Sequence, residues 1–157
     1  MVSSVLMVCM GNICRSPIAE HVFRAKSVEA GLNLRVASAG TGGWHAGEPA
    51  DHRAVAVLNE NGYTSEHRAQ QFQATWFDDY DLIIVMDEDN RHGVLKHAIT
   101  KVHRDKVKLF REFDATAPMN AEVPDPYYSD IDAYVEVLKM VERASDGLIA
   151  HILNNAK

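Results

Sequence analysis

The chain of 157 residues has few cysteines, an excess of negative over positive charge, and no long apolar run. Its longest apolar stretches, residues 5–10 and 82–86, are too short to span a bilayer, so we expect no membrane insertion. The 16 lysines and arginines against 22 acidic residues give a net charge of −6, which argues against nucleic acid as a partner. Because the overall field is acidic, any local anion site has to be built by the residues that line it.

Only two cysteines are present, Cys9 and Cys14, which are too few for a disulfide framework. The N-terminus has neither the basic stretch nor the small-residue cleavage site of a signal peptide, so we expect a cytoplasmic protein. The eight histidines offer no familiar metal-ligand spacing, since the nearest two are His92 and His97, and neither cysteine belongs to a CxxC pair. We therefore expect no metal and no cofactor.

Strands alternate with helices along the chain. Short apolar runs rich in β-branched residues predict strands at residues 4–9, 34–39, 81–86 and 107–110. Amphipathic spacing predicts helices at 17–31, 51–61, 87–99 and after Ser129 up to 152, and an ambiguous short helix within 69–79. Ser16 and Ser129 are the expected N-caps of the first and last helix. This alternation predicts an α/β fold, a single-domain doubly wound sheet of about four parallel strands flanked by helices on both faces, formed by residues 1–157.

Ligands of such sheets bind beyond the carboxyl ends of the strands, where the strand order reverses. The first strand runs straight into Cys9, and the segment up to Pro17 reads Cys-Met-Gly-Asn-Ile-Cys-Arg-Ser-Pro. Such a short loop before a helix can curl so that its N–H groups point inward, next to the positive end of the helix dipole. Gly11 and Asn12 tolerate the positive φ that curling demands, and the planar fork of Arg15 matches two phosphate oxygens.

The loop therefore predicts a phosphate site with Cys9 at its base. Helix N-termini and nearby cations favour an ionised thiol, so we expect a thiolate, to which the hydroxyl of Ser16 can donate a hydrogen bond. A strand-end cysteine is otherwise a small buried hydrophobe, and Cys-x5-Arg alone is a weak motif. The whole string is more specific, because its chance occurrence is on the order of 10⁻⁹ per start site from average residue usage.

The string from Val8 to Pro17 resembles the signature of the low-molecular-weight protein tyrosine phosphatases. The likeness covers nearly the whole chain, least between residues 96 and 123, and continues in Ser38-Ala39-Gly40-Thr41, His67-Arg68-Ala69, Met86-Asp87-Glu88 and Asp125-Pro126-Tyr127-Tyr128. The resemblance implies a phosphatase that hydrolyses phosphotyrosine through a phosphocysteine, without metal or cofactor. Tyrosine-phosphorylated proteins are the implied substrates, a tyrosine kinase being one candidate.

The implied site has a nucleophile, a clamp and an acid. Cys9 attacks, Arg15 holds the phosphate, and Asp125 protonates the leaving oxygen, a proton transfer that contributes about 10²–10⁴-fold in rate. Asp-Pro alone is also ordinary turn chemistry, so the role of Asp125 follows from the resemblance. An acidic pH optimum is expected because Asp125 must be protonated while Cys9 is not. The implied phosphate and substrate contacts are Met10, Gly11, Asn12, Ile13, Cys14, Ser16, Trp44, Tyr127 and Tyr128.

Other residues are expected to support the site. Asn12 is interpreted as locking the loop conformation. The resemblance suggests a buried pair of Glu20 and His67 behind the loop, although two surface residues fit the sequence almost as well. It also implies a reversible disulfide between Cys9 and Cys14 on oxidation, against the alternative that Cys14 is a small packing residue.

Two other functions remain open at this point. A thiol-dependent arsenate reductase can share the loop, but its thioredoxin-coupled form needs two further cysteines and none follows Cys14. A non-catalytic phosphate-binding module would keep only the anion site. The combination of Cys9, Arg15, Ser16 and Asp125 argues against it, since binding alone requires neither a nucleophile nor an acid.

Overall fold

A four-stranded parallel sheet forms the centre of the molecule. The computed structural model describes residues 1–155. Its strands are β1 (Ser4–Cys9), β2 (Arg35–Gly40), β3 (Leu82–Val85) and β4 (Val107–Leu109). They lie in the order β2-β1-β3-β4, and every neighbouring pair is parallel. The predicted single-domain doubly wound α/β fold is confirmed, with the fully buried β1 in the interior of the sheet.

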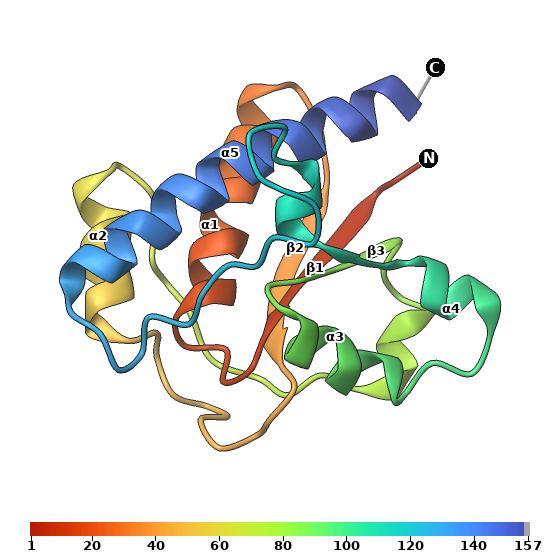
Figure 1. Ribbon diagram of the computed structural model, residues 1–157, viewed down its shortest axis with the longest axis horizontal. Coiled ribbons are helices and arrows are strands. Elements are labelled where there is room, and N and C mark those ends of the chain that lie inside the picture. The colour runs from red at the N-terminus through yellow and green to blue at the C-terminus, as the bar shows by residue number, and fades with distance from the viewer. Residues whose placement is uncertain (156–157) are drawn as a thin grey trace.

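Helices cover both faces of this sheet (Figure 1). On one face, α1 (Arg15–Glu29), α2 (His52–Glu60) and the long α5 (Ile131–Asn155) pack over the side chains of Val5 and Met7. On the other face, to which Leu6 and Val8 of β1 point, lie α3 (Glu88–Leu95), α4 (Lys101–Asp105) and the short 3₁₀ helix η1 (Ala74–Phe77). The alternation of β1 residues between the two clusters is the period of two expected for a strand buried on both sides.

Both predicted serine N-caps are wrong. Helix α1 begins at Arg15, so Ser16 lies inside it, and its hydroxyl contacts the sulfur of Cys9 instead of a backbone N–H. Helix α5 begins at Ile131, and the carboxylate of Asp130, rather than Ser129, accepts from the N–H of Asp132. At α5 another cap-forming residue, Asp130, takes the position. At α1 the side chain of Ser16 is engaged with the sulfur of Cys9.

The chain after α2 differs in part from the prediction. The short helix expected within residues 69–79 is the 3₁₀ helix η1, and the residues before it are extended because Gln70 and Phe72 make backbone hydrogen bonds with Gly40 at the end of β2. Helix α3 ends at Leu95 rather than 99, and the five-residue α4 and the 3₁₀ helix η2 (Phe110–Phe113) were not predicted. Elements of one turn carry too few residues to show an apolar period.

No helix within the described part of the chain combines the length and the apolarity needed to cross a lipid bilayer.

Candidate active site

The loop that follows β1, residues 9–16, lies where the strand order reverses. Strand β1 lies between β2 and β3, and the connection after β1 leads to β2 on one side, whereas the connection after β3 leads to β4 on the other. This is the switch point at which ligands of open α/β sheets bind. The loop, here called the cysteine loop, leads directly into the N-terminus of α1.

Asn12 holds the curled shape of the cysteine loop. It has a φ of 59°, and its fully buried side-chain amide donates to Ser16 Oγ at 2.7 Å and to Ser38 Oγ at 2.9 Å. Its Oδ1 accepts from the N–H of Gln70 at 2.9 Å. The left-handed backbone predicted for Asn12 is therefore observed, but Gly11 does not have a positive φ. A Cβ on Gly11 would lie 3.0 Å from the ring of His45, so close packing explains that glycine.

The carbonyl groups of the cysteine loop bond to the surrounding scaffold. The oxygens of Cys9 and Met10 accept from main-chain N–H groups at 2.9 Å, and that of Ile13 accepts at 2.8 Å. The oxygen of Asn12 accepts from a histidine ring nitrogen at 2.6 Å. Among residues 1–155, in contrast, no acceptor is bonded to the N–H groups of Met10, Gly11, Ile13 and Cys14. A curved row of unused N–H donors next to a helix N-terminus is a binding site for an anion.

Cys9 lies at the base of this row. Its side chain is buried, and its sulfur is 2.9 Å from Ser16 Oγ and 3.3 Å from the N–H of Asn12. Because Ser16 Oγ already accepts from the amide of Asn12, its own proton is available to donate to the sulfur. Two donors are therefore directed at one sulfur.

Arg15 reaches over the same site from the first turn of α1. Its Nη1 donates to Asp87 Oδ2 at 2.6 Å and to the carbonyl of Val123 at 3.0 Å, and its side chain is only 3% exposed. Asp87 also N-caps α3, since its other oxygen accepts from the N–H of Asn90 at 2.7 Å. This orienting role of Asp87 was not predicted, although its place just beyond β3 puts it at the carboxyl edge of the sheet.

Asp125 lies close to Arg15. Its Oδ2 is 3.8 Å from Arg15 Nη2, and its Oδ1 accepts from the N–H of Tyr127 at 3.1 Å. The carboxyl group is 34% exposed, so it is open to the cavity and to water. Residues 121–130, here called the acid loop, therefore bring a carboxyl group to the edge of the anion site.

A cavity of about 260 Å³ opens above Cys9. It is lined by Cys9, Met10, Gly11, Ile13, Cys14, Arg15, Trp44, His45, Asp125, Tyr127 and Tyr128. Of the predicted contacts, only Asn12 and Ser16 do not line it, because both are buried beneath the cysteine loop. His45 was not predicted; only its neighbour Trp44 drew attention in the sequence.

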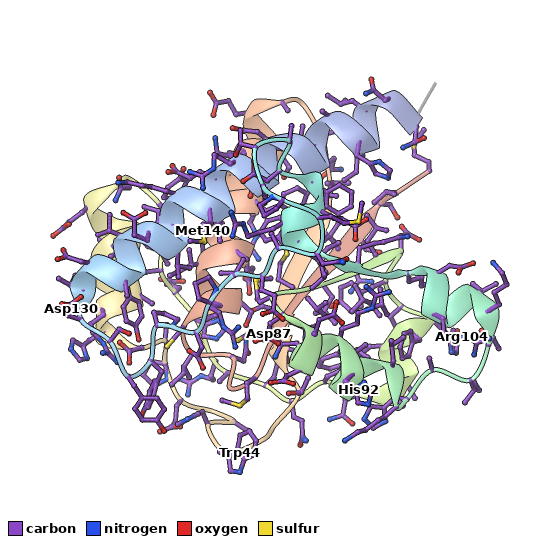
Figure 2. The ribbon with its side chains drawn as sticks, viewed as in Figure 1. Trp44, Asp87, His92, Arg104, Asp130 and Met140 are labelled. Atoms are coloured by element: carbon purple, nitrogen blue, oxygen red, sulfur yellow. The ribbon has the colours of Figure 1, made fainter. Side chains whose placement is uncertain are left out.

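Aromatic side chains form the mouth of this cavity. Tyr127 and Tyr128 pack edge to face with ring centroids 4.9 Å apart, and Tyr128 is 94% exposed. Figure 2 shows Trp44 at the outer edge of its loop, whereas Asp87 lies further inside at the start of α3. Walls of this kind suit a flat ring attached to the anion.

Polar groups behind the cysteine loop support it. His67 Nε2 donates to the carbonyl of Asn12 at 2.6 Å, and its Nδ1 lies 4.0 Å from Glu20 Oε1. The same Glu20 oxygen accepts from Ser38 Oγ at 2.5 Å. Burial lowers the pKa of His67, so the ring is neutral at pH 7. Glu20 and His67 thus both lie behind the loop, although each makes its shorter contact with a different residue.

Cys14 is held differently from Cys9. Its sulfur lies 3.1 Å from the hydroxyl of Tyr134, and burial raises the pKa of its thiol to about 12. Both cysteines are free thiols. The implied disulfide between them remains a prediction.

Within residues 1–155, no group of three or more histidine, cysteine or carboxylate side chains is placed to hold a metal ion.

Comparisons with known proteins agree with this geometry. The profile of a family described as low molecular weight phosphotyrosine protein phosphatase matches residues 4–157. A low molecular weight protein-tyrosine-phosphatase of Streptomyces coelicolor is 48% identical over 151 residues, covering 94% of this chain and 92% of that protein. Low molecular weight protein-tyrosine phosphatase A of Mycobacterium tuberculosis is 42% identical, covering 92% and 88%.

Among solved structures, a protein tyrosine phosphatase from Entamoeba histolytica with Hepes in its active site superposes with a TM-score of 0.93. It is 31% identical to this chain, and the match covers 99% of both chains.

Proposed function

Because this chain belongs to the low molecular weight protein-tyrosine phosphatase family, and is therefore a hydrolase of phosphotyrosine, we propose that three residues divide its chemistry. Cys9 is the nucleophile, Arg15 the phosphate clamp, and Asp125 the general acid and base. The observation that carries this assignment is the row of unused N–H donors around the sulfur of Cys9.

In the first step, the loop N–H groups and Arg15 bind the phosphate dianion of the substrate. The Cys9 thiolate attacks phosphorus, forming the S–P bond while the bond to the tyrosine oxygen breaks. Asp125 transfers its proton to that oxygen, so that tyrosine leaves as a neutral phenol. The same donors stabilise the equatorial oxygens of the transition state, which makes electrostatic preorganisation the largest contribution.

In the second step, water attacks the phosphocysteine. Asp125, now a carboxylate, accepts a proton from the water while the S–P bond breaks and inorganic phosphate forms. The sulfur leaves as a thiolate, stabilised by the hydroxyl of Ser16 at 2.9 Å and the N–H of Asn12 at 3.3 Å. The enzyme is thereby returned to its starting state.

Turnover of para-nitrophenyl phosphate in the presence of a chelator tests this proposal. The wild type should hydrolyse the ester, and Cys9→Ser should lose essentially all activity because a serine hydroxyl is not ionised at neutral pH. The variant should still bind inorganic phosphate, because the loop donors remain. Equal rates above the uncatalysed rate would remove Cys9 from the mechanism, and phosphate binding with no catalysis by either protein would favour a non-catalytic phosphate-binding module.

The substrates are proteins that carry phosphotyrosine. We propose a tyrosine kinase as one of them, and expect the aromatic mouth of the cavity to stack on the substrate ring. The variant Asp125→Ala should bind phosphopeptides but hydrolyse them slowly. Peptides captured with it identify the phosphotyrosine sequences that the enzyme binds. Capture of phosphoserine peptides in equal yield would contradict the selectivity for tyrosine.

We further propose that residues 1–157 act as one phosphatase domain, because two apolar clusters share the single sheet. A cytoplasmic location is proposed on chemical grounds. The mechanism requires Cys9 as a free thiolate, and reducing compartments keep thiols in that form.

A further inference from the structure

Arg53, in the first turn of α2, has no role in the proposed chemistry but makes several polar contacts. Its Nε and Nη2 donate to the two oxygens of Asp51 at 3.0 and 2.9 Å. Its Nη1 donates to the carbonyl of Ser129 at 2.7 Å, and Nη2 also donates to that of Tyr127 at 3.0 Å. The guanidinium lies 4.6 Å from the ring centroid of Tyr134 in α5. A planar fork in this position joins α2, α5 and the acid loop.

The Asp51 end of this arrangement is fixed to the cysteine loop. The N–H of Asp51 donates to the carbonyl of Ile13 at 2.8 Å, and its carboxylate caps α2 by accepting from the N–H of Arg53 at 2.9 Å. The side chain of Asp51 is only 9% exposed. Arg53 is therefore attached, through Asp51, to the loop that surrounds Cys9.

The other end of the arrangement leads to the general acid. Tyr127, whose carbonyl Arg53 binds, donates its own N–H to Asp125 Oδ1 at 3.1 Å. Before Asp125, the acid loop is held by Val123, which bonds to Met86 and Arg15. After Asp125, no helix or strand restrains the chain until α5 begins at Ile131. The two hydrogen bonds from Arg53 are therefore the main restraint on the carboxyl side of the acid.

We propose that Arg53 is a positioning residue for catalysis, which holds the acid loop in register with the cysteine loop so that the carboxyl of Asp125 faces the leaving oxygen. This inference rests on the proposed role of Asp125. Arg53 itself does not line the cavity above Cys9, and its charge is paired with Asp51, so it is not a phosphate ligand. Misplacement of a reacting group by about 1 Å can cost about 10²-fold in rate, which is the size of effect that such a restraint controls.

Lysine cannot replace this arginine. One ammonium group would have to bridge a carboxylate and two carbonyls that are now met by three separate nitrogens of a rigid plane. Arg53→Lys should therefore keep the charge of α2 and the fold but loosen the acid loop.

Leaving-group dependence of kcat/KM separates positioning of the acid from general damage. Phenyl phosphate needs a proton on its leaving oxygen, whereas 2,4-dinitrophenyl phosphate releases a stable anion without one. Arg53→Lys and Arg53→Ala should lower kcat/KM by about 10-fold to 100-fold for phenyl phosphate and by less than about 2-fold for the dinitrophenyl ester. Arg143→Ala is the matched control, because it removes an arginine in the far part of α5, where it pairs with Asp114. The kcat/KM of this variant should change by the same factor for both esters.

Asp125→Ala distinguishes failure of this inference from failure of the proposed function. It should show the same preference for the dinitrophenyl ester, more strongly. If Asp125→Ala shows no such preference, the role of Asp125 is wrong. If it does, and both Arg53 variants slow the two esters equally or not at all, the positioning role of Arg53 is wrong while the proposed function stands. Circular dichroism establishes that each variant is folded. If Arg53→Ala is unfolded, the test is made with Arg53→Lys alone.

Discussion

The two cysteines occupy opposite environments within one loop. Cys9 faces a hydroxyl and an unused row of N–H groups, which stabilise a negative sulfur. Cys14 is buried against the hydroxyl of Tyr134, and burial is the main reason why the pKa of its thiol rises to about 12. The two thiols therefore differ in what surrounds them: donors are directed at the sulfur of Cys9, whereas burial keeps the thiol of Cys14 protonated.

This contrast predicts selective alkylation. At pH 7, iodoacetate should modify Cys9 and leave Cys14 unmodified, because only the thiolate reacts and Cys14 stays protonated far above neutral pH. Inorganic phosphate should protect Cys9 by occupying the loop. Peptide mapping by mass spectrometry measures both sites, with Cys9→Ser as the unreactive control. Preferential labelling of Cys14 would show that the environments have been assigned the wrong way round.

At the scale of elements, β1 and α1 place the cysteine loop. The strand is apolar along its whole length and ends at Cys9, so both its burial and the position of the site could be predicted from the sequence. The residue types of Arg15 and Asn12 also predicted their positions, at the phosphate site and in the curled backbone of the cysteine loop. The orienting role of Asp87 and the contacts of Arg53 could not be predicted, because they join segments that lie far apart in the chain.

The shortest helices and the reason for one glycine could not be predicted from the sequence either. The one-turn helices α4 and η2 show no apolar period, and their formation depends on packing beside the sheet. Gly147 lies inside α5, although glycine is a poor helix former. In the structure, a Cβ at this position would lie 1.7 Å from the carbonyl oxygen of Phe113, so the glycine permits the helix to cross η2 closely.

Gly147→Ala should therefore destabilise the protein, although alanine is the better helix former by about 1 kcal/mol. The added methyl meets main-chain atoms that cannot rotate away, and overpacking of this kind typically costs about 1–3 kcal/mol. Urea denaturation measures the change. Gly93→Ala in α3 is the comparison, because its Cβ would meet only side-chain atoms, those of Thr41, the nearest being its methyl carbon at 3.0 Å. A more stable Gly147→Ala protein would contradict the close crossing.

At the scale of the whole molecule, buried titratable groups connect stability to pH. Burial lowers the pKa of His21 and His67 below the usual histidine value. The backbone N–H of Ser3, together with Ser4, lowers the pKa of Asp81, which ties the start of β1 to the start of β3. In each case the folded state releases its proton more readily than the unfolded state does.

The free energy of unfolding should therefore fall in two stages as the pH is lowered. The contribution of the histidines is present above their unfolded pKa of about 6.5 and is lost below it, and that of Asp81 is present above about 3.9 and is lost below it. Asp81→Asn should cost about 1 kcal/mol at pH 7, a modest value because the carboxylate is partly exposed. The difference from the wild type should shrink as the pH falls below about 3.9 and through the lowered pKa of Asp81 in the folded protein. Urea denaturation across this range measures it, and a difference that grows in acid would reverse the sign assigned to Asp81.

The account as a whole requires phosphorus to become bonded to one sulfur during turnover. Acid quenching of the enzyme during hydrolysis of para-nitrophenyl phosphate, followed by mass spectrometry of its peptides, tests this directly. We predict one added phosphoryl group on Cys9, more abundant in Asp125→Asn, where water is activated poorly, and absent in Cys9→Ser. A phosphoryl group on any other residue, or steady turnover by an enzyme that is never phosphorylated, would contradict the mechanism.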